Sequence, residues 1–206
     1  MIRQTQTSRQ DGERGMELVP ASQFSMAELT EAYNQARADY LVPMAMDADR
    51  LAAYIQLYDV DLDRSWVAVD GAEILGLAML GVRAGRTWLT RLGVLPHHRR
   101  HGTGEALVRA LLATTQELGC RVSVLEVIQG NRAAHELFLK AGFRETRELL
   151  ILRRPPGISP HKVPGRAAWL AREEAVERVR GYSARQPWTN EVETYQNAGD
   201  VQGWRL

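Results

Sequence analysis

The chain has 206 residues, a formal net charge of +1, a hydrophobic fraction of 45% and a charged fraction of 25%. These values are typical of one globular domain with an appendage. A net charge this small favours neither nucleic acid nor an anionic membrane surface as a partner. The single cysteine, Cys120, excludes an internal disulfide framework, and we expect it to be a small core residue.

The chain contains no signal for export or membrane insertion. No apolar run approaches the length that spans a bilayer. Residues 1–15 are polar and lack the apolar core of a signal peptide, so we predict a disordered N-terminal arm there. With the lone cysteine, these features lead us to expect a cytoplasmic location.

The first 70 residues contain two helix signals between strand signals. We expect a short strand over Met16–Val19. Ser25 and Glu28 form a capping-box pattern before a first helix, and Asp47 is suited to cap a second. Aspartates alternate at positions 59, 61 and 63 without the glycine and glutamate of a calcium loop, so a solvated acidic loop is expected.

Three consecutive strands are predicted next. Their ranges are 66–69, 73–82 and a central strand that begins at Thr87. The dipeptides Asp70-Gly71 and Ala84-Gly85 between them are typical of tight hairpin turns. Short connections of this kind predict an antiparallel meander.

The central strand leads into a basic turn and a long helix. Pro96 ends the apolar run, and Arg99, Arg100 and His101 come directly before Gly102-Thr103-Gly104. The first N–H groups of a helix have no internal partner and lie at the positive end of its dipole. Glycines let an anion approach that backbone, and arginine adds forked donors. The segment therefore predicts a cradle for phosphate or pyrophosphate.

Two familiar phosphate motifs do not fit this segment. A nucleotide P-loop needs a lysine after its last glycine, and none follows Gly104. The dinucleotide fingerprint needs a third glycine or alanine where Leu107 stands. The plain structural alternative is a glycine-rich helix start with solvated arginines.

The rest of the chain predicts a crossover and a separate tail. The long helix ends near Gly119, and a strand is expected over Val122–Ile128, parallel to the central strand. A short helix closed by Gly142 and a last strand over Leu149–Leu152 complete the sheet. After the boundary at Pro155-Pro156-Gly157 we predict a helix over Arg166–Arg180. The tail is too short for its own core, so we expect it to cover the main domain, to contact a second copy, or to open a further module.

Two blocks of residues resemble one enzyme family. Arg99-x-x-Gly102-x-Gly104, after a strand that ends in Val94, resembles the acetyl-CoA signature of the GNAT superfamily of N-acetyltransferases. The second block runs from Leu125 to Phe143 and resembles the bacterial protein-N-terminal acetyltransferase branch of that superfamily; its matching residues are Leu125, Glu126, Val127, Asn131, Ala134, Leu137, Phe138, Gly142 and Phe143. The resemblance covers about Met16–Arg154. It implies an α/β fold with a mixed, mostly antiparallel sheet, a splayed parallel pair and flanking helices.

The resemblance also implies roles for particular residues. Backbone groups at Leu92, Gly93 and Val94 would pair with the pantetheine arm of acetyl-CoA as an added strand would. The pyrophosphate would lie on the basic turn and helix start, at Arg99, Arg100, His101, Gly102, Thr103 and Gly104. Asn131 would bond the thioester end, or cap a helix, or do both. Phe138 is the last residue assigned to the cosubstrate site.

Glu126 is the catalytic residue that the resemblance implies. A carboxylate in an apolar strand is expected to lose hydration, which raises its pKa and suits a general base for an amine. The structural alternative is an edge glutamate or an ion-pair partner. Phe138 stands where the family often has a tyrosine that protonates the leaving thiolate, so Tyr40, Tyr54 or Tyr58 would have to serve, or the thiolate would leave unaided.

The sequence leaves two functions and several partners open. The first function is direct acetyl transfer from acetyl-CoA to an amine of a small molecule or a peptide N-terminus, without nucleic acid or membrane. The second is a non-catalytic acyl-CoA-binding or regulatory module. His97, His98 and His101 have no carboxylate partner in sequence, so we expect phosphate contact and no metal. We divide the chain into an arm (1–15), a catalytic domain (16–154) and a helical extension (155–206). Trp169 and Trp188 would anchor this extension, which could form a homodimer or shield the acceptor groove.

Overall fold

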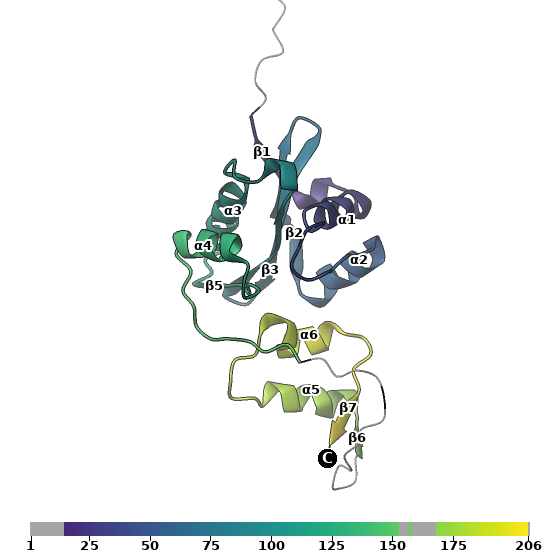
Figure 1. Ribbon diagram of the computed structural model, residues 1–206. Helices are drawn as coiled ribbons and strands as arrows, with labels where there is room; N and C mark the ends of the chain where they lie inside the picture. The colour runs from purple at the N-terminus through teal and green to yellow at the C-terminus, as the bar shows by residue number, and fades with distance from the viewer. Residues whose placement is uncertain (1–14, 153–156, 158–167, 206) are drawn as a thin grey trace, which may run out of the picture.

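The computed structural model describes residues 15–152, 157 and 168–205. Its centre is a five-stranded sheet with the strand order β1-β2-β3-β4-β5 (Figure 1). The first four strands are antiparallel neighbours, and β5 is parallel to β4. The strands are β1 (Glu17–Pro20), β2 (Val60–Asp70), β3 (Glu73–Arg83), β4 (Arg86–Val94) and β5 (Val122–Val124). The expected fold class, a mixed and mostly antiparallel sheet with one parallel pair, is confirmed.

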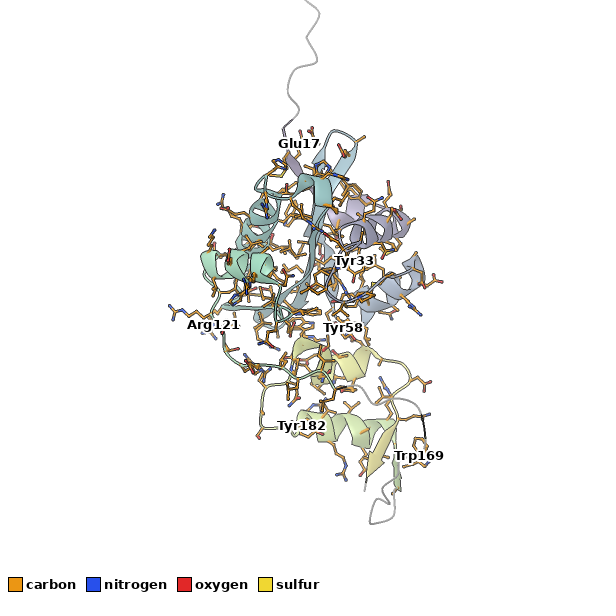
Figure 2. All side chains as sticks on the ribbon, in the orientation of Figure 1. Glu17, Tyr33, Tyr58, Arg121, Trp169 and Tyr182 are labelled. Atoms are coloured by element: carbon orange, nitrogen blue, oxygen red, sulfur yellow. The ribbon has the colours of Figure 1, made fainter. Side chains whose placement is uncertain are left out.

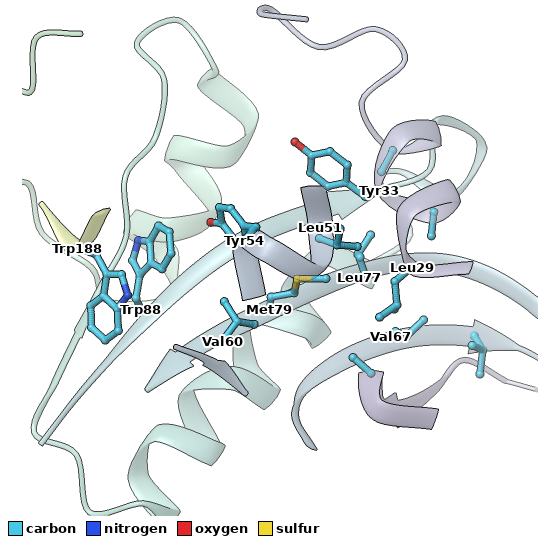
Figure 3. Close-up of a cluster of buried hydrophobic side chains, with 14 residues drawn as sticks. Leu29, Tyr33, Leu51, Tyr54, Val60, Val67, Leu77, Met79, Trp88 and Trp188 are labelled. Atoms are coloured by element: carbon cyan, nitrogen blue, oxygen red, sulfur yellow. The ribbon is translucent and has the colours of Figure 1, made fainter. Parts of the chain in front are cut away.

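Helices cover both faces of this sheet. One face carries α1 and α2, and the other carries α3 and α4 (Figure 1). Each face encloses a hydrophobic cluster, one centred on Leu29, Leu51 and Met79 (Figure 3) and one on Leu107 and Leu111. The helices are α1 (Met26–Gln35), α2 (Ala48–Leu57), α3 (Thr103–Glu117) and α4 (Arg132–Lys140).

The local signals for helix starts and turns are confirmed. The Ser25 hydroxyl accepts from the Glu28 amide, and the Glu28 carboxylate accepts from the Ser25 amide, which completes the capping box. The Asp47 carboxylate accepts from the Arg50 amide at 2.8 Å. Gly71 and Gly85 have φ angles of 61° and 70°. Glycine adopts this left-handed conformation without the strain that most other residues would have.

Three expected segments differ from the structure. The acidic stretch is not a loop, because residues 60–63 begin β2, with a register shift between Asp61 and Trp66. The strand predicted over Val122–Ile128 ends at Val124. Leu149–Leu152 forms no strand, and Leu150, Ile151 and Leu152 are more than four-fifths exposed. The last two predictions rested on apolar composition alone, but a strand forms only where a neighbouring strand edge accepts its hydrogen bonds.

The C-terminal extension has its own small elements below the sheet (Figure 1). The helix predicted over Arg166–Arg180 begins only at Arg172, because the residues just before it pair as a strand. The predicted boundary at 155–157 and the start of that helix lie mostly outside the described residues. The elements are β6 (Ala168–Leu170), α5 (Arg172–Arg180), a 3-10 turn (Trp188–Asn190), α6 (Val192–Asn197) and β7 (Gly203–Arg205), with β6 and β7 antiparallel.

The extension packs against the main sheet through Trp188. This side chain is 1% exposed and stacks on Trp88 of β4, with ring centroids 5.7 Å apart and planes 16° apart (Figure 3). Its indole N–H donates to the Tyr58 carbonyl at 2.8 Å. Trp188 is therefore the buried anchor that was expected. Trp169, the second expected anchor, belongs to β6, is 57% exposed and lies far from the main five-stranded sheet (Figure 2).

A buried cluster of charges surrounds this anchor. The Arg83 guanidinium donates to Asp59 at 2.7 Å, to the Trp188 carbonyl at 2.7 Å and to Glu191 at 2.9 Å. Arg86 holds the same Glu191 carboxylate through two bonds of 2.8 Å. The extension is thus tied to the β3–β4 hairpin of its own chain. Among the described residues, no helix is long and apolar enough to cross a membrane.

Candidate acetyltransferase site

Strands β4 and β5 separate before β4 ends. Their parallel pairing runs only from Arg86 to Trp88 on β4, opposite Val122–Val124. The remainder of β4, up to Val94, continues beyond the last residue of β5. A register shift opposite Leu77–Met79 of β3 and a positive φ of 53° at Arg91 mark a bulge in this free part of β4. Bulges re-aim side chains and end pairing next to functional sites.

The expected pantetheine-binding residues lie in this free part of β4. Both relevant carbonyls already accept one hydrogen bond: Leu92 from Arg37 Nη2 at 3.4 Å, and Val94 from Arg99 Nε at 3.1 Å. A carbonyl oxygen has a second lone pair, so each can accept another bond. A Cβ on Gly93 would come within 2.8 Å of Ala36 Cβ, so glycine is needed for α1 to approach β4.

The basic turn leads directly into α3. Helix α3 begins at Thr103, and its N-cap is Gly102, whose φ is 85° and which supplies no side-chain cap. Arg100, two residues earlier, also has a positive φ of 65° and is exposed. The first backbone N–H groups of α3 therefore have no side-chain cap and lie at the positive end of a four-turn dipole. This arrangement suits an anion.

Arg99 and Arg100 differ in what their side chains contact. The Arg99 guanidinium forms two bonds to the Asp39 carboxylate, at 2.6 and 2.7 Å, and one to the Ala36 carbonyl at 3.1 Å. The hydrogen bonds from Arg99 to the Asp39 carboxylate, together with the charge of Arg99, lower the pKa of Asp39. Arg99 thus ties the end of α1 to β4, while Arg100 makes no hydrogen bond or ion pair to the described residues. The phosphate role of both arginines stays a prediction, and the structure leaves Arg100 the freer of the two.

The histidines of this turn are spread over separate contacts. His98 Nε2 lies 2.8 Å from Glu73 Oε1 in an exposed pair. No group of three or more His, Cys, Asp or Glu side chains within the described part of the chain has metal-binding geometry. His97 and His101 are exposed beside the start of α3.

Glu126 lies just beyond β5, where the two strands separate. The residue as a whole is exposed, yet its carboxylate turns inward and accepts the indole N–H of Trp88 at 2.6 Å. Loss of hydration raises the pKa of Glu126. The Trp88 N–H, the Trp188 backbone and the charge of Arg147 oppose this effect only in part. A raised pKa is what a carboxylate base needs near neutral pH.

Asn131 and Phe138 belong to the second block. The Asn131 side chain caps α4 by accepting from the Ala134 amide at 3.3 Å, which confirms the capping role. Its Nδ2 donates to no other described residue, so the amide still has free donors. Phe138 is 8% exposed and packs edge-to-face on Phe143 at 5.9 Å between centroids.

Three tyrosines were candidates to replace the missing acid. Tyr54 is the one nearest the strand gap, because its hydroxyl bonds the Thr90 hydroxyl at 2.6 Å. Burial raises the pKa of Tyr54 to about 12, so the phenol keeps its proton at neutral pH. Tyr58 packs against Tyr54 and Trp88, and Tyr40, in the connection after α1, stacks against Arg37.

Two arginines near this gap were not singled out from the sequence. Arg91 stacks over Tyr33 and Tyr54, and Arg37 stacks over Tyr33 and Tyr40. A charged residue inside the apolar run of β4 was the signal for Arg91. Nothing in the sequence pattern distinguished Arg37 from other polar residues at a helix end.

The comparisons with known proteins agree with this geometry. The family model described as "Acetyltransferase (GNAT) family" matches residues 22–143, more than half of the chain, so the chain belongs to this family. A mycothiol acetyltransferase of Parafrankia sp. is 41% identical over 90 residues, which are 43% of this chain and 26% of that protein. The chain thus spans about a quarter of the length of this curated relative.

Solved structures show the same fold. The yncA protein of Salmonella typhimurium, solved with acetyl-CoA, has a TM-score of 0.53 and 24% identity, over 64% of this chain and 81% of that one. The ribosomal-protein-S18-alanine N-acetyltransferase of Escherichia coli has a TM-score of 0.53 and 21% identity, over 65% and 80%. At these identities the likeness concerns the fold.

Proposed function

We propose that this chain is an acetyl-CoA-dependent N-acetyltransferase that transfers the acetyl group directly to an amine. The observation that carries the proposal is the inward-turned Glu126 carboxylate at the point where β4 and β5 separate. The uncapped start of α3 and the free part of β4 lie along the same strand-to-helix segment. Family membership and a neighbour solved with acetyl-CoA support the same cosubstrate.

The cosubstrate would supply an activated acyl group as a thioester. Arg100, Gly102 and the first amides of α3 would bind its pyrophosphate. The free backbone of β4 at Leu92–Val94 would hold the pantetheine arm, with the free Asn131 amide donors near its end. These residues would place the thioester carbonyl beside Glu126, where β5 no longer pairs with β4.

Glu126 would act on the acceptor. An alkylammonium group has no lone pair, so it must lose a proton before its nitrogen can attack a carbonyl. The Glu126 carboxylate would take that proton, the new C–N bond would form, and the C–S bond would break to release the thiolate. A pKa raised by lost hydration makes the carboxylate a better acceptor for this proton.

The thiolate can depart without the tyrosine that Phe138 replaces. Thiols are acidic enough to leave as thiolates near neutral pH. The Tyr54 hydroxyl, which stays protonated, is the phenol best placed near the gap to donate a hydrogen bond after a side-chain movement. A non-catalytic acyl-CoA-binding module is the alternative, and the replacement of the family tyrosine by Phe138 is the observation that favours it.

The acceptor would be an amine on a small molecule or at a peptide N-terminus. The Escherichia coli neighbour acetylates the alanine of a ribosomal protein, according to its description, and the second block resembles that branch. We propose a cytoplasmic location on the basis of the lone cysteine, which fits a reducing compartment.

The test is Glu126→Gln, assayed by thiol release from acetyl-CoA with a panel of peptides, polyamines, amino acids and aminoglycosides. Glutamine keeps an oxygen that can accept the Trp88 N–H, so the fold and the affinity for CoA should stay as they are. Turnover should fall by roughly 10²–10⁴-fold. A variant that retains the full wild-type rate from pH 6 to 9 would remove Glu126 from the mechanism. CoA binding by a wild type that acetylates no member of the panel would favour the non-catalytic module.

A further inference from the structure

Arg37 and Arg91 converge on one buried aromatic ring. Their guanidinium carbons lie 4.7 and 5.0 Å from the centroid of Tyr33, which is 1% exposed. Arg91 also lies 3.9 Å from the centroid of Tyr54, and Arg37 lies 4.5 Å from that of Tyr40. The two cations are thus held in place by aromatic faces, which restrict flexible side chains without neutralising them.

Neither of these cations has a carboxylate counterion among the described residues. The other arginines that are fixed against the sheet do have one: Arg83 and Arg86 hold Glu191, and Arg99 holds Asp39. A guanidinium has five N–H donors, but within the described part of the chain Arg91 makes one bond, to the Tyr33 hydroxyl at 2.7 Å, and Arg37 makes one long bond, to the Leu92 carbonyl.

The Nε atoms of both arginines are buried and have no partner in the described part of the chain. Buried polar groups in native proteins are nearly always bonded, so such exceptions call for an explanation. Two partly buried cations that stack on the same aromatic ring repel each other, and a bound anion offsets that repulsion. An anionic group that reached both guanidinium groups would accept from their remaining Nη donors.

The pair borders the proposed reaction site. Arg91 occupies the bulge of β4, three residues beyond Trp88, the last residue that pairs with β5. Arg37 bonds the carbonyl of Leu92, the next residue of β4. Burial is the main cause of the raised pKa of Tyr54, and the charges of Arg91 and Glu126 both act on that same hydroxyl. The two arginines and Glu126 therefore lie around one region, on the α1–α2 side of the strand gap.

We propose that Arg37 and Arg91 form a subsite for an oxyanion, a carboxylate or phosphate, carried by the amine acceptor. The acceptor class is then an amine with a nearby negative charge, such as an amino acid, a phosphoamine or a peptide with an acidic residue near its N-terminus. This inference rests on the proposed acetyltransferase function and specifies its substrate. Forked guanidinium donors match both oxyanions, whereas a polyamine or a neutral amino sugar would leave the pair without a counterion.

The experiment compares matched acceptors that differ in one charge. Glycine is paired with glycinamide, and phosphoethanolamine with ethanolamine, in the full-length protein at saturating acetyl-CoA. We expect kcat/KM to favour the anionic member of at least one pair by about tenfold or more, as loss of a charge-assisted bond predicts. Arg37→Gln and Arg91→Gln should reduce that preference to about threefold or less, by slowing the anionic member alone.

Two controls keep the result interpretable. Arg109→Gln removes an exposed arginine of α3, with a side chain that is 76% exposed, and should change no preference. Arg91→Lys keeps the charge and loses the forked geometry, so an intermediate preference is expected. Arg37→Gln removes one long hydrogen bond and the ring contacts with Tyr33 and Tyr40, but it leaves the Arg91–Tyr33 bond in place, so it carries the test if Arg91→Gln does not fold.

Several outcomes would overturn the subsite. One is a wild type with no preference for the anionic members, and another is a preference that survives both glutamine substitutions. A rise in the KM for acetyl-CoA, with both members of each pair slowed equally, would assign the arginines to a phosphate of the cosubstrate.

Calorimetry with N-acetylglycine and its amide, in the presence of CoA, separates this inference from the proposed function. The titration needs no turnover. If the anion binds in an arginine-dependent way while no acceptor is acetylated, the subsite stands and the acetyltransferase proposal fails. If neither compound binds and no pair is discriminated, the subsite is wrong.

Discussion

At the scale of single residues, two glutamates beside tryptophans have opposite pKa shifts. Burial raises the pKa of Glu126, and the one side-chain donor to its carboxylate among the described residues is the Trp88 N–H. Burial also raises the pKa of Glu191, but hydrogen bonds from Arg86 and Arg83 outweigh it and leave that pKa below its usual range. The number of cationic donors decides the direction. Glu126 is thereby suited to proton transfer and Glu191 to a permanent charge.

Trp88→Phe tests the coupling between Trp88 and Glu126. The indole N–H lowers the pKa of Glu126, so its removal should raise this pKa further. Because a base works in its deprotonated form, the acidic limb of the kcat/KM profile should move to higher pH. Trp66→Phe is the matched control, since its indole N–H donates to Thr114 and not to a carboxylate. Identical pH profiles for Trp88→Phe and the wild type would show that this bond does not tune the base.

The raised pKa of Glu126 also predicts a pH dependence of stability. A carboxyl group whose pKa is raised in the folded state contributes stability below its unfolded pKa of about 4.5, and this is lost as pH rises through the folded pKa. Glu126→Gln has no such loss. The free energy of unfolding of the variant, relative to wild type, should therefore increase from pH 4 to pH 8 in urea titrations. If the difference in unfolding free energy between variant and wild type did not change with pH, burial would not raise the pKa of the Glu126 carboxylate.

At the scale of elements, the site depends on where strands β4 and β5 end and where helix α3 begins. Strand β5 stops at Val124, β4 continues to Val94, and α3 begins without a side-chain cap at Gly102. The Leu92 and Val94 carbonyls of β4 each keep a second lone pair, and the first N–H groups of α3 have no side-chain cap. These groups follow one another along a single strand-turn-helix segment, which is why one extended ligand with a phosphate end can use all of them.

Arg100→Ala and Gly104→Ala test the start of α3. Arg100 is exposed and has no hydrogen-bonded partner among the described residues, so its loss should not affect the fold. A Cβ on Gly104 would meet Leu137 Cδ2 at 3.4 Å, an ordinary contact, so the protein tolerates it while a ligand on the backbone would not. We expect CoA affinity to fall by about 1.5–3 kcal/mol for the arginine. Calorimetry that finds wild-type affinity in both variants, with Arg109→Ala as control, would move the cradle elsewhere.

At the scale of the whole molecule, the extension and the sheet share one buried region. Trp188 covers Trp88, whose N–H holds Glu126, so the extension forms part of the surroundings of the proposed base. Asn197 adds bonds to the Leu57 carbonyl and to Asp59, at 3.2 and 2.7 Å. These contacts lie within one chain. Self-association and shielding of the acceptor groove stay predictions, as do the domain boundaries at 15 and 154.

Glu191→Gln tests how the extension is held. Its carboxylate lies between Arg83 and Arg86. Removal of one member of a buried ion pair lowers the free energy of unfolding by about 3–5 kcal/mol. We expect this as an upper bound, because Asp59 still pairs with Arg83 in the variant. Glu174→Gln, in an exposed pair with Arg178, should cost less than about 1 kcal/mol. Urea denaturation measures both. Equal effects would mean that the cluster contributes little.

The lowered pKa of Glu191 fixes the pH at which this contact weakens. A carboxylate with a depressed folded pKa contributes stability above its unfolded pKa of about 4.5, and this is lost as pH falls through the folded pKa. Proteolysis within residues 168–205 should therefore accelerate below about pH 4.5 in the wild type. In Glu191→Gln it should already be fast at pH 7.

The sequence by itself determined the elements that depend on local chemistry. Caps at Ser25 and Asp47, turns at Gly71 and Gly85, and the order of strand, basic turn and helix all follow from interactions within a few residues. The family, the fold class and the candidacy of Glu126 could therefore be predicted from motifs. The strand predicted over 122–128 was too long and the one predicted over 149–152 was wrong, because apolar composition does not reveal whether a partner edge is present.

Only the tertiary structure decided which distant residues meet. Arg83 contacts Glu191 across 108 positions, and Trp88 meets both Trp188 and Glu126. Arg37 and Arg91 meet on the Tyr33 ring only because the end of α1 packs on β4, where a Cβ on Gly93 would come within 2.8 Å of Ala36 Cβ. Charges and rings that are far apart in sequence interact through space and through shared burial, and neither can be read from spacing along the chain. The observations behind the proposed substrate class, and the contacts that hold the extension to the sheet, therefore became visible only in the fold.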